Sequence, residues 1–587
     1  MTEMKHNILK ITTLLLALAA LAGCDIEPVF YKQVAPDTFY DSKDAVWQRY
    51  YRSFTHARWT FAQDGSPFAL QELTTDEFIS PVRGGQNASR GEDYKMHYHD
   101  FPIYFGASYQ VYASRMVGVA RCWAALDDLR DVDLASFGFP EGTWENWTAQ
   151  LTALAGLNYL EGLDCFGGLP LYAESAEEER PRSTAKETFN FIEKLFNEAM
   201  PNLEAKTALG AEEKGEIHKA MAALGLAKLY FNAVSYIGEE RYEDAARICQ
   251  DLIDGKYGAY ELDKDWTKIF GFENAWSNEI IWSIPSERAQ LETDAYYEWG
   301  RQMPTNMSNY FGGIPNSNGS NQYCLTPSLD GNGQPYTYKL GSPFSKFEDT
   351  DVRKKKYRYL GNGKYEGMFL FGELVNPDNS SWKVIGTQEY SGQTLRLVDQ
   401  VARLSEGKKE SSMETGEENS GVRLVKFSPR PNANDANLLF NPDIPIMRLT
   451  EAYYILAECK WRSGDKKGAA ELINEVRKRY FENGNDPYPV GAVKDKDGNV
   501  QKDGSGNIVF DYEKVDMWRL LDEWMIEFIG ENRRRTDLIR WNQYITGEWW
   551  DHTPDGATNA HKKLFPISTH ILNVSDVIKQ NPGYSDK

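Results

Sequence analysis

The side chains with the clearest chemical potential lie in residues 294–323, where aromatic rings alternate with amides and glycines. A pyranose ring packs its axial C–H face on an aromatic ring, while its hydroxyls seek amide, carboxylate and guanidinium partners. Because no helical period places these rings on one apolar face, a sugar-binding surface is favoured here, and the alternative is an ordinary core. The residues predicted to bind are Tyr296, Tyr297, Trp299, Asn306, Asn309, Tyr310, Phe311 and Tyr323.

A second segment of this kind occupies residues 76–100. Its glycines provide flexibility, its arginine and asparagine side chains provide hydrogen-bond donors, and its tyrosines provide stacking faces. An ordinary polar loop whose tyrosines face the core is an equal alternative. The candidate binding residues are Asp76, Arg83, Asn87, Tyr94 and Tyr98.

Motifs of enzymatic chemistry are not found in the sequence. There is no Gly-x-Ser-x-Gly, no phosphate-binding loop, no His-Glu-x-x-His and no Cys/His nucleophile pattern. His97 and His99 form one pair without further ligands in the sequence pattern, so a surface or packing role is favoured over a metal site. We therefore predict no catalytic residue, no metal and no cofactor. A carboxylate pair for glycoside hydrolysis stays open, because its spacing is set in three dimensions.

The elements that must position these side chains are mainly helices. Apolar residues three or four apart predict helices over 151–163, 186–203, 217–236, 242–253, 446–462, 466–480 and 517–530. In two places a helix, a glycine turn and paired alanines on the next helix resemble the tetratricopeptide unit. One such hairpin ends in the helix with Ala245 and Ala246, and the other in the helix with Ala469 and Ala470.

The amino-acid composition changes between the two hairpins. Residues 285–440 are rich in Gly, Asn, Ser, Tyr and Pro, and a long irregular stretch of this kind is usually functional. Within it, residues 405–420 have the composition of an exposed loop. Beyond the second hairpin, Asp-Gly pairs at 497–498 and 503–504 predict a surface hairpin insertion over 483–512.

Charged residues near the C-terminus follow a helical spacing. Glu527, Glu531, Arg534, Asp537 and Arg540 lie three or four apart and can pair along one helix. This pattern favours a structural ion-pair network over a catalytic carboxylate pair.

The N-terminus carries a secretory signal. Lys5 and Lys10 precede an uncharged apolar run at 11–21, which is too short to span a bilayer. The run ends in Leu-Ala-Gly-Cys24, which resembles the lipobox of bacterial lipoproteins, so we expect Cys24 to carry acyl chains. The alternative is an ordinary signal peptide followed by a chance cysteine. Acidic residues directly after Cys24 favour the outer leaflet of the outer membrane, facing the cell exterior.

Composition excludes several partners. A net charge of −21 argues against nucleic acid, which requires clustered Lys and Arg, and against attachment to anionic lipid through basic residues. Of the six cysteines, the five besides Cys24 are widely spaced without a Cys-x-x-Cys, which is neither a disulfide framework nor a zinc site. Aromatic residues make up 13% of the chain, more than a helical core needs by itself.

Several short motifs follow one another in a particular order along the mature chain. Phe-Gly-Gly-Leu-Pro-Leu ends at residue 171, Glu-Ile-Ile begins at 279, and Pro445 and Arg448 precede Glu451. Ile-Asn-x-Val-Arg ends at 477, and Gln-Asn-Pro-Gly-Tyr ends at 584. Together with the charged C-terminal pattern, these motifs resemble the SusD/RagB family over nearly the whole mature chain. Gly168, Trp524 and Asn532 depart from residues common there and could weaken local salt bridges.

The resemblance implies an all-α dominated fold, in which tetratricopeptide-like hairpins form a scaffold with long irregular loops and a few short strands. It also implies sugar-binding aromatic residues in the two loop segments and a SusC-like TonB-dependent transporter as partner. We expect a signal peptide over 1–23, an N-terminal helical region over 24–284, and a C-terminal region over 285–587 with the ligand-binding segment.

Three classes of function remain in competition. The leading prediction is a surface lipoprotein that captures oligosaccharides and delivers them to the transporter. The alternatives are a surface glycoside hydrolase and a helical-repeat scaffold that binds proteins without a small ligand. The sequence does not name the glycan, and a peptide-type nutrient stays open.

Overall fold

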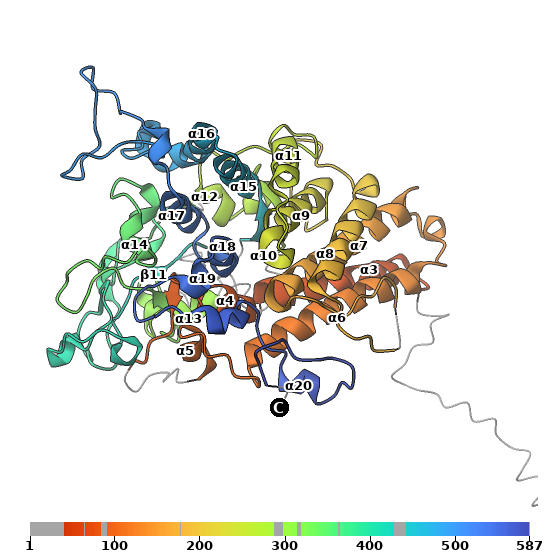
Figure 1. Ribbon diagram of the computed structural model, residues 1–587, viewed down its shortest axis with the longest axis horizontal. Helices are drawn as coiled ribbons and strands as arrows, with labels where there is room; N and C mark the ends of the chain where they lie inside the picture. The colour runs from red at the N-terminus through yellow and green to blue at the C-terminus, as the bar shows by residue number, and fades with distance from the viewer. Residues whose placement is uncertain are drawn as a thin grey trace, which may run out of the picture.

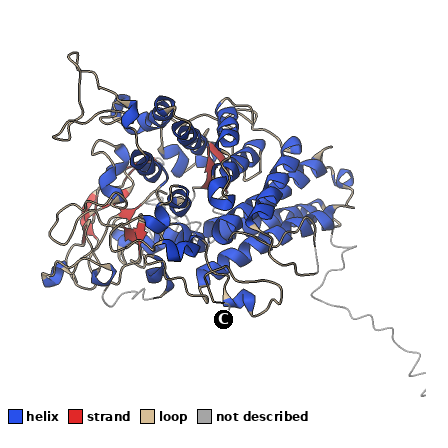
Figure 2. Cartoon of the chain, in the orientation of Figure 1, coloured by secondary structure: helices blue, strands red, loops and turns tan. Residues whose placement is uncertain are grey.

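The computed structural model describes residues 40–63, 65–83, 91–175, 178–286, 297–313, 319–361, 364–427 and 442–585. Within these ranges helices dominate and strands are short, which confirms the predicted fold class (Figure 2). None of the helices in the described part is both long enough and apolar enough to cross a membrane. The predicted signal peptide and Cys24 lie outside the described residues.

The N-terminal half is a layer of long helices that run side by side (Figure 1). The helix predicted over 151–163 is longer than expected, and the one predicted over 186–203 ends earlier, where Pro201 follows. Thr184 and Glu187 form a reciprocal capping box that fixes the start of this second helix. The elements are α3 (Lys43–Arg58), α4 (Ser66–Gln71), α5 (Glu92–Met96), α6 (Gly106–Leu129), α7 (Thr143–Phe166) and α8 (Ala185–Ala199), with a π-helix at Trp59–Gln63.

The two predicted hairpins are present and stack on each other, because α11 packs against α15. The helix predicted over 217–236 is interrupted at Asn232, whose backbone leaves the helical region. The first hairpin consists of α9 (Lys219–Phe231), α10 (Ala233–Ile237) and α11 (Tyr242–Ile253). The second consists of α15 (Leu449–Arg462) and α16 (Lys466–Arg477).

One predicted helix starts in the wrong place. The segment 446–448 is not helical but ends strand β12 (Ile444–Arg448), which pairs antiparallel with β2 (Ile280–Ile284). Both strands are almost entirely buried, so an apolar run of this length suits a buried strand as well as a helix. This pairing and the α11–α15 contact cross the boundary expected at residue 284, which stays a prediction.

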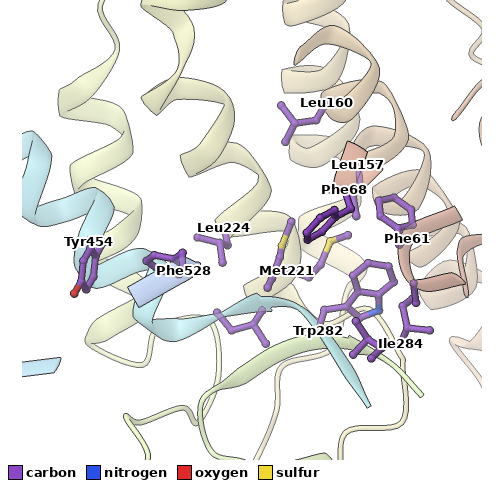
Figure 3. Packing of buried hydrophobic residues seen from close by; sticks show 14 of the residues in the cluster. Phe61, Phe68, Leu157, Leu160, Met221, Leu224, Trp282, Ile284, Tyr454 and Phe528 are labelled. Atoms are coloured by element: carbon purple, nitrogen blue, oxygen red, sulfur yellow. The ribbon is translucent and has the colours of Figure 1, made fainter. Parts of the chain in front are cut away.

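A single large apolar cluster joins the helical layers (Figure 3). Phe61 and Phe68 come from the N-terminal helices, and Trp282 comes from β2. The indole Nε1 of Trp282 donates to the carbonyl oxygen of Gly215 at 3.1 Å, so this buried ring keeps no unpaired donor. Small residues let the helices approach closely: the ring of Phe196 in α8 lies between Gly156 of α7 and Gly225 of α9.

The charged C-terminal motif forms a network across several elements rather than along one helix. It is divided between α17 (Met517–Phe528) and α18 (Arg534–Arg540), with Glu531 in the connection. Glu527 and Glu531 bind Arg448 at the end of β12, at distances of 2.8 Å each. Asp537 and Arg540 do pair within α18, at 2.9 Å. The network is buried and structural, as predicted, but most of its ion pairs join different elements instead of neighbouring turns of one helix.

The loop-rich region carries small antiparallel pairs of strands instead of one sheet. The paired strands are β1 (Phe78–Ile79) with β3 (Cys324–Leu325), β4 (Arg358–Gly361) with β5 (Lys364–Glu366), β6 (Phe369–Leu370) with β11 (Arg423–Leu424), β7 (Gly372–Glu373) with β10 (Arg396–Leu397), and β8 (Val375–Asn376) with β9 (Asn379–Lys383). Short helices among and after them are α12 (Thr267–Phe270), α13 (Tyr297–Gln302), α14 (Pro343–Lys346), α19 (Gln543–Thr546) and α20 (Thr569–Leu572).

Two predicted loops have different outcomes. The segment 405–420 is exposed only in its first half, and residues 413–420 are largely buried because Arg83 donates to the carbonyl oxygens of Glu417 and Ser420 at 2.8 Å. The prediction of an exposed loop was wrong there. The hairpin insertion is present, because Lys494 forms an antiparallel β-bridge with Val500 and Lys502 forms one with Ile508. The segment projects from the body of the molecule (Figure 1).

Candidate functional site

A surface groove of about 220 Å³ opens between β4, the β8–β9 hairpin and the chain before residue 313. We call it the Trp382 groove. It combines five aromatic side chains with an arginine, an aspartate and two asparagines. Its lining residues are Tyr310, Phe311, Gly312, Tyr357, Arg358, Tyr359, Asn376, Pro377, Asp378, Asn379 and Trp382.

The β8–β9 hairpin owes its shape to the sequence Asn-Pro-Asp-Asn at 376–379. Proline fixes φ at the second position of a turn, and asparagine at the first position can accept from the backbone ahead of it. The side-chain oxygen of Asn376 accepts from the backbone N–H groups of Asp378 at 2.9 Å and Asn379 at 2.8 Å. The strand register shifts between Val375 and Asn376, so the pairing of this hairpin is irregular beside the turn.

The floor of the groove is buried and hydrogen-bonded. Tyr310 and Phe311 are both buried, and the hydroxyl of Tyr310 donates to the carbonyl oxygen of Tyr357 at 2.6 Å. Burial raises the pKa of Tyr310, so this hydroxyl stays protonated and remains a donor. The side-chain amide of Asn376 donates to the carbonyl oxygen of Tyr310 at 2.9 Å and joins the hairpin to this floor.

The rim of the groove is polar and open to solvent. Arg358 and Asp378 form an exposed ion pair at 2.9 Å, which contributes little to stability. The side chain of Trp382 is 39% exposed, which is unusual for an indole. An exposed indole beside a guanidinium, a carboxylate and amides offers a stacking face together with donors and acceptors for hydroxyl groups.

The residues predicted in the first segment separate into three groups. Tyr310 and Phe311 contribute to the groove, and Asn306 and Asn309 support it by donating to the carbonyl oxygens of Ile385 at 2.9 Å and Lys383 at 3.0 Å. Tyr323 lies elsewhere in the core, where its ring stacks on Phe68. Tyr296 lies outside the described residues. Tyr297 and Trp299 lie on α13, but the described part of the structure does not include their side chains.

The residues predicted in the second segment do not line the groove. Asp76 is fully buried and binds Arg534 at 2.7 Å; burial would raise its pKa, but this guanidinium holds it below the ordinary value. Arg83 is also buried, bound to backbone carbonyl oxygens, and Asn87 lies outside the described residues. The structure gives Asp76, Arg83 and Tyr323 packing roles, and no observation tests their predicted part in binding.

Tyr94 and Tyr98 form a separate, half-buried pair. Their rings meet edge to face with centroids 5.4 Å apart. The hydroxyl of Tyr94 donates to Glu414 at 2.9 Å, and that of Tyr98 donates to Asp551 at 2.7 Å. Burial and the Asp551 carboxylate raise the pKa of Tyr98, so it stays neutral. Because both hydroxyls serve the fold, this pair is less open to a ligand than the Trp382 groove.

Sequence reasoning missed the exposed half of the groove: Arg358, Tyr359, Asp378, Asn379 and Trp382. A signal for them was present. Trp382 stands in the polar run Asn-Ser-Ser-Trp-Lys directly after an Asn-Pro-Asp turn, where no apolar alternation requires an indole. Another hollow, of about 130 Å³, lies beside the buried ion-pair network, but its lining includes Phe427 and Ile444, which lie on either side of the undescribed residues 428–441.

Comparison with known proteins identifies the family that has this architecture. The profile of the SusD family matches residues 278–584, more than half of the chain. The chain belongs to the SusD family. Starch-binding protein SusD of Bacteroides thetaiotaomicron is 23% identical over 455 residues, covering 74% of this chain and 72% of the relative.

Solved structures agree with the fold of the SusD family. NanU of B. fragilis superposes with a TM-score of 0.66 at 16% identity, covering 94% of this chain and 99% of that one. A laminarin-binding SusD-like protein superposes with a TM-score of 0.56 at 16% identity, covering 93% of this chain and 100% of that one. The names of two of these proteins, SusD and the laminarin-binding protein, state that they bind starch and laminarin.

Proposed function

We propose that this SusD-family protein captures oligosaccharides at the cell surface and binds them in the Trp382 groove. The observation that carries the proposal is the exposed indole of Trp382 beside Arg358, Asp378 and Asn379, over a buried aromatic floor. Support also comes from the relatives, whose names state that they bind starch and laminarin.

The expected contribution of Trp382 can be bounded. Stacking on an aromatic ring contributes about 0.5–1.5 kcal/mol beyond the area that is buried. A surface receptor with a dissociation constant between about 1 mM and 1 μM binds with about 4–8 kcal/mol in total. Losing the widest ring of the groove, with the area it buries, should therefore weaken binding about tenfold.

The test is affinity electrophoresis of the full-length protein in native gels that contain single polysaccharides. We expect at least one glycan to retard the wild type and Trp382→Ala to lose most of that retardation. Trp59→Ala is the matched control, because Trp59 is 41% exposed against 39% for Trp382 but belongs to the N-terminal π-helix. Thermal melting of both variants should stay within a few degrees of the wild type, since neither indole is in the core.

Two results would contradict the groove. If Trp382→Ala is retarded as strongly as the wild type, the binding face lies elsewhere, and Trp299→Ala becomes the next variant to examine. If the control loses retardation equally, the effect is not local. Release of reducing ends from the retarding glycan would instead favour the hydrolase alternative.

We further propose that Cys24 holds the protein in the outer membrane on the extracellular side, and that a SusC-like TonB-dependent transporter receives the ligand. The lipobox resemblance supports the anchor. The family supports the transporter as partner. The stacked hairpins α9–α11 and α15–α16 offer helical surface on which such a partner could dock.

A further inference from the structure

Three side chains suited to metal binding meet where the segment after α5 contacts the segment after α19. One nitrogen each of His99 and His552 and one oxygen of Asp555 all lie within 4.8 Å of one another. His99 and His552 are buried, and the side chain of Asp555 is only 5% exposed. His99 lies more than four hundred residues before His552 and Asp555 in the sequence, so only the fold brings it to the other two.

The backbone around the two imidazoles fixes where their protons lie. Nε2 of His99 faces the carbonyl oxygen of Thr74 at 2.7 Å, and Nδ1 of His552 faces the carbonyl oxygen of His97 at 2.7 Å. A carbonyl oxygen can only accept, so each of these nitrogens carries its hydrogen. The opposite nitrogens, Nδ1 of His99 and Nε2 of His552, are then the ones that can bind a metal ion. Metal-binding histidines typically donate their other N–H to a backbone carbonyl in this way.

One of these nitrogens has no partner. Nε2 of His552 is buried and accepts no hydrogen bond among the described residues. The ring cannot easily turn to find one, because Trp549 stacks on it with centroids 3.7 Å apart and an angle of 3° between the planes. A buried polar atom left without a partner is costly, so the site is incomplete as a purely hydrogen-bonded cluster.

Asp555 supplies the charge. Its Oδ2 faces Nδ1 of His99 at 2.5 Å, and its Oδ1 accepts from the ammonium of Lys562 at 2.7 Å. A carboxylate oxygen and an imidazole lone pair face each other only when a cation lies between them, either a proton or a metal ion. The Lys562 contact holds the carboxylate in place, as the hydrogen bonds around ligating carboxylates do.

We propose that this cluster binds one Zn²⁺ ion through Nδ1 of His99, Nε2 of His552 and Oδ2 of Asp555. Two imidazoles and a carboxylate are ligands that zinc accepts, at about 2.0–2.2 Å. Zinc would replace the proton between His99 and Asp555 and would satisfy Nε2 of His552 as well, which one proton cannot do. A water molecule completes a tetrahedral set. The sequence predicted no metal, because it could not show that His552 and Asp555 lie beside His99.

The proposed ion would act as a structural clip. It joins the segment that follows α5, which carries Tyr98, to the segment after α19, which contacts Tyr98 through Asp551. Binding to the folded state alone raises stability in proportion to the logarithm of the metal concentration over its dissociation constant. We therefore expect the ion to stabilise the fold rather than to take part in chemistry.

The test uses the full-length protein in detergent, stripped with a chelator and then given Co²⁺ or Zn²⁺ alone. We expect one equivalent of Co²⁺ to bind with the intense visible absorption of a four-coordinate site, and one equivalent of Zn²⁺ to displace it. The melting temperature should rise with zinc and fall again with chelator. His552→Gln and Asp555→Asn should each weaken metal binding at least about tenfold.

His56→Gln is the matched control, because His56 is also a buried histidine whose Nε2 contacts a backbone carbonyl, that of Ser114, at 2.8 Å. It should keep the full equivalent of metal. The proposal is overturned if the stripped wild type takes up no Co²⁺ or Zn²⁺, a result that does not depend on whether any variant folds. It is equally overturned if His552→Gln binds metal as tightly as the wild type.

Discussion

The buried charges of this protein depend on several partners each. The carboxylate of Glu527 accepts from Arg448 at 2.8 Å, from Arg479 at 3.1 Å and from Arg353 at 3.2 Å. Burial alone would raise the pKa of Glu527, but these three guanidinium groups lower it from 4.5 to about 2. Removing one ion from such a network leaves its buried partners with uncompensated charge, which lowers the free energy of unfolding.

The pH dependence of stability follows from the direction of this shift. The folded state holds Glu527 ionised more strongly than the unfolded chain does, so its contribution is complete above about pH 4.5 and is lost as the pH falls towards about 2. We expect Glu527→Gln to lower the free energy of unfolding at neutral pH by about 3–5 kcal/mol. Its melting temperature should also fall less steeply than that of the wild type between about pH 4.5 and 2.

Glu482 is an exposed glutamate and provides the control for Glu527. Glu482→Gln should change the neutral melting temperature and its acid slope little, because an exposed carboxylate keeps its hydration. Differential scanning fluorimetry of the three proteins across the acid range makes the comparison. Equal slopes for Glu527→Gln and the wild type would show that this carboxylate is not stabilised as its contacts indicate.

Single residues of the candidate site were predictable only in part. Composition predicted that Tyr310 and Phe311 bind a ligand, but it could not show that they form the floor of the Trp382 groove, because their burial depends on packing against Tyr357 and on the amide of Asn376. Trp382 was overlooked because one ring in a short polar strand gives little periodic signal.

At the scale of elements, structure that depends on local sequence pattern was predicted, whereas structure that depends on a distant partner was not. The helix over 242–253 was predicted to the residue, since apolar spacing is a local signal, and the left-handed Gly255 follows its end. The last three residues of the strand at 444–448 were taken for helix because its partner, β2, lies far away in the sequence. Pairing with a distant strand leaves no trace in the local period.

The contact between α7, α8 and α9 leads to a prediction about packing. A Cβ at Gly225 would lie 2.6 Å from the ring of Phe196, and on the other side a Cβ at Gly156 would lie 3.2 Å from it. The ring cannot move away from one helix without approaching the other. We therefore expect Gly225→Ala to lower the free energy of unfolding by about 1–3 kcal/mol through overpacking, although alanine is the better helix former.

Gly300 is the matched control, because it is a helical glycine with open space around its Cβ position. Gly300→Ala should be neutral or stabilising by about 0.5–1 kcal/mol. The double variant Gly225→Ala with Phe196→Leu should recover part of the loss, because it removes the ring that clashes. Urea unfolding of the three variants measures this, and a stable Gly225→Ala would mean that the helices can separate at no cost.

For the whole molecule, the proposed anchor at Cys24 would decide where the protein works. Cys24→Ser should move the protein from the membrane fraction to the soluble fraction and abolish labelling with palmitate, because the acyl chains supply the attachment. A Cys24→Ser protein that stays membrane-bound and labelled would contradict the anchor.

The proposed transporter can be tested by purification. Purification of the tagged wild type in mild detergent should recover a membrane protein of barrel size in near-equal amount. A wild type recovered alone would count against the transporter.

The insertion at 483–512 begins and ends at nearly the same point of the fold. Arg477, the last residue of α16, binds Glu523 of α17 through two contacts of 2.8 and 2.9 Å, so the helices on either side are joined independently of the chain between them. Lengthening a loop whose ends are already fixed adds only about 0.6 kcal/mol for each doubling. Evolution can therefore lengthen, shorten or rewrite this segment among descendants of the protein without disturbing the scaffold, which makes it a natural place for related proteins to diverge.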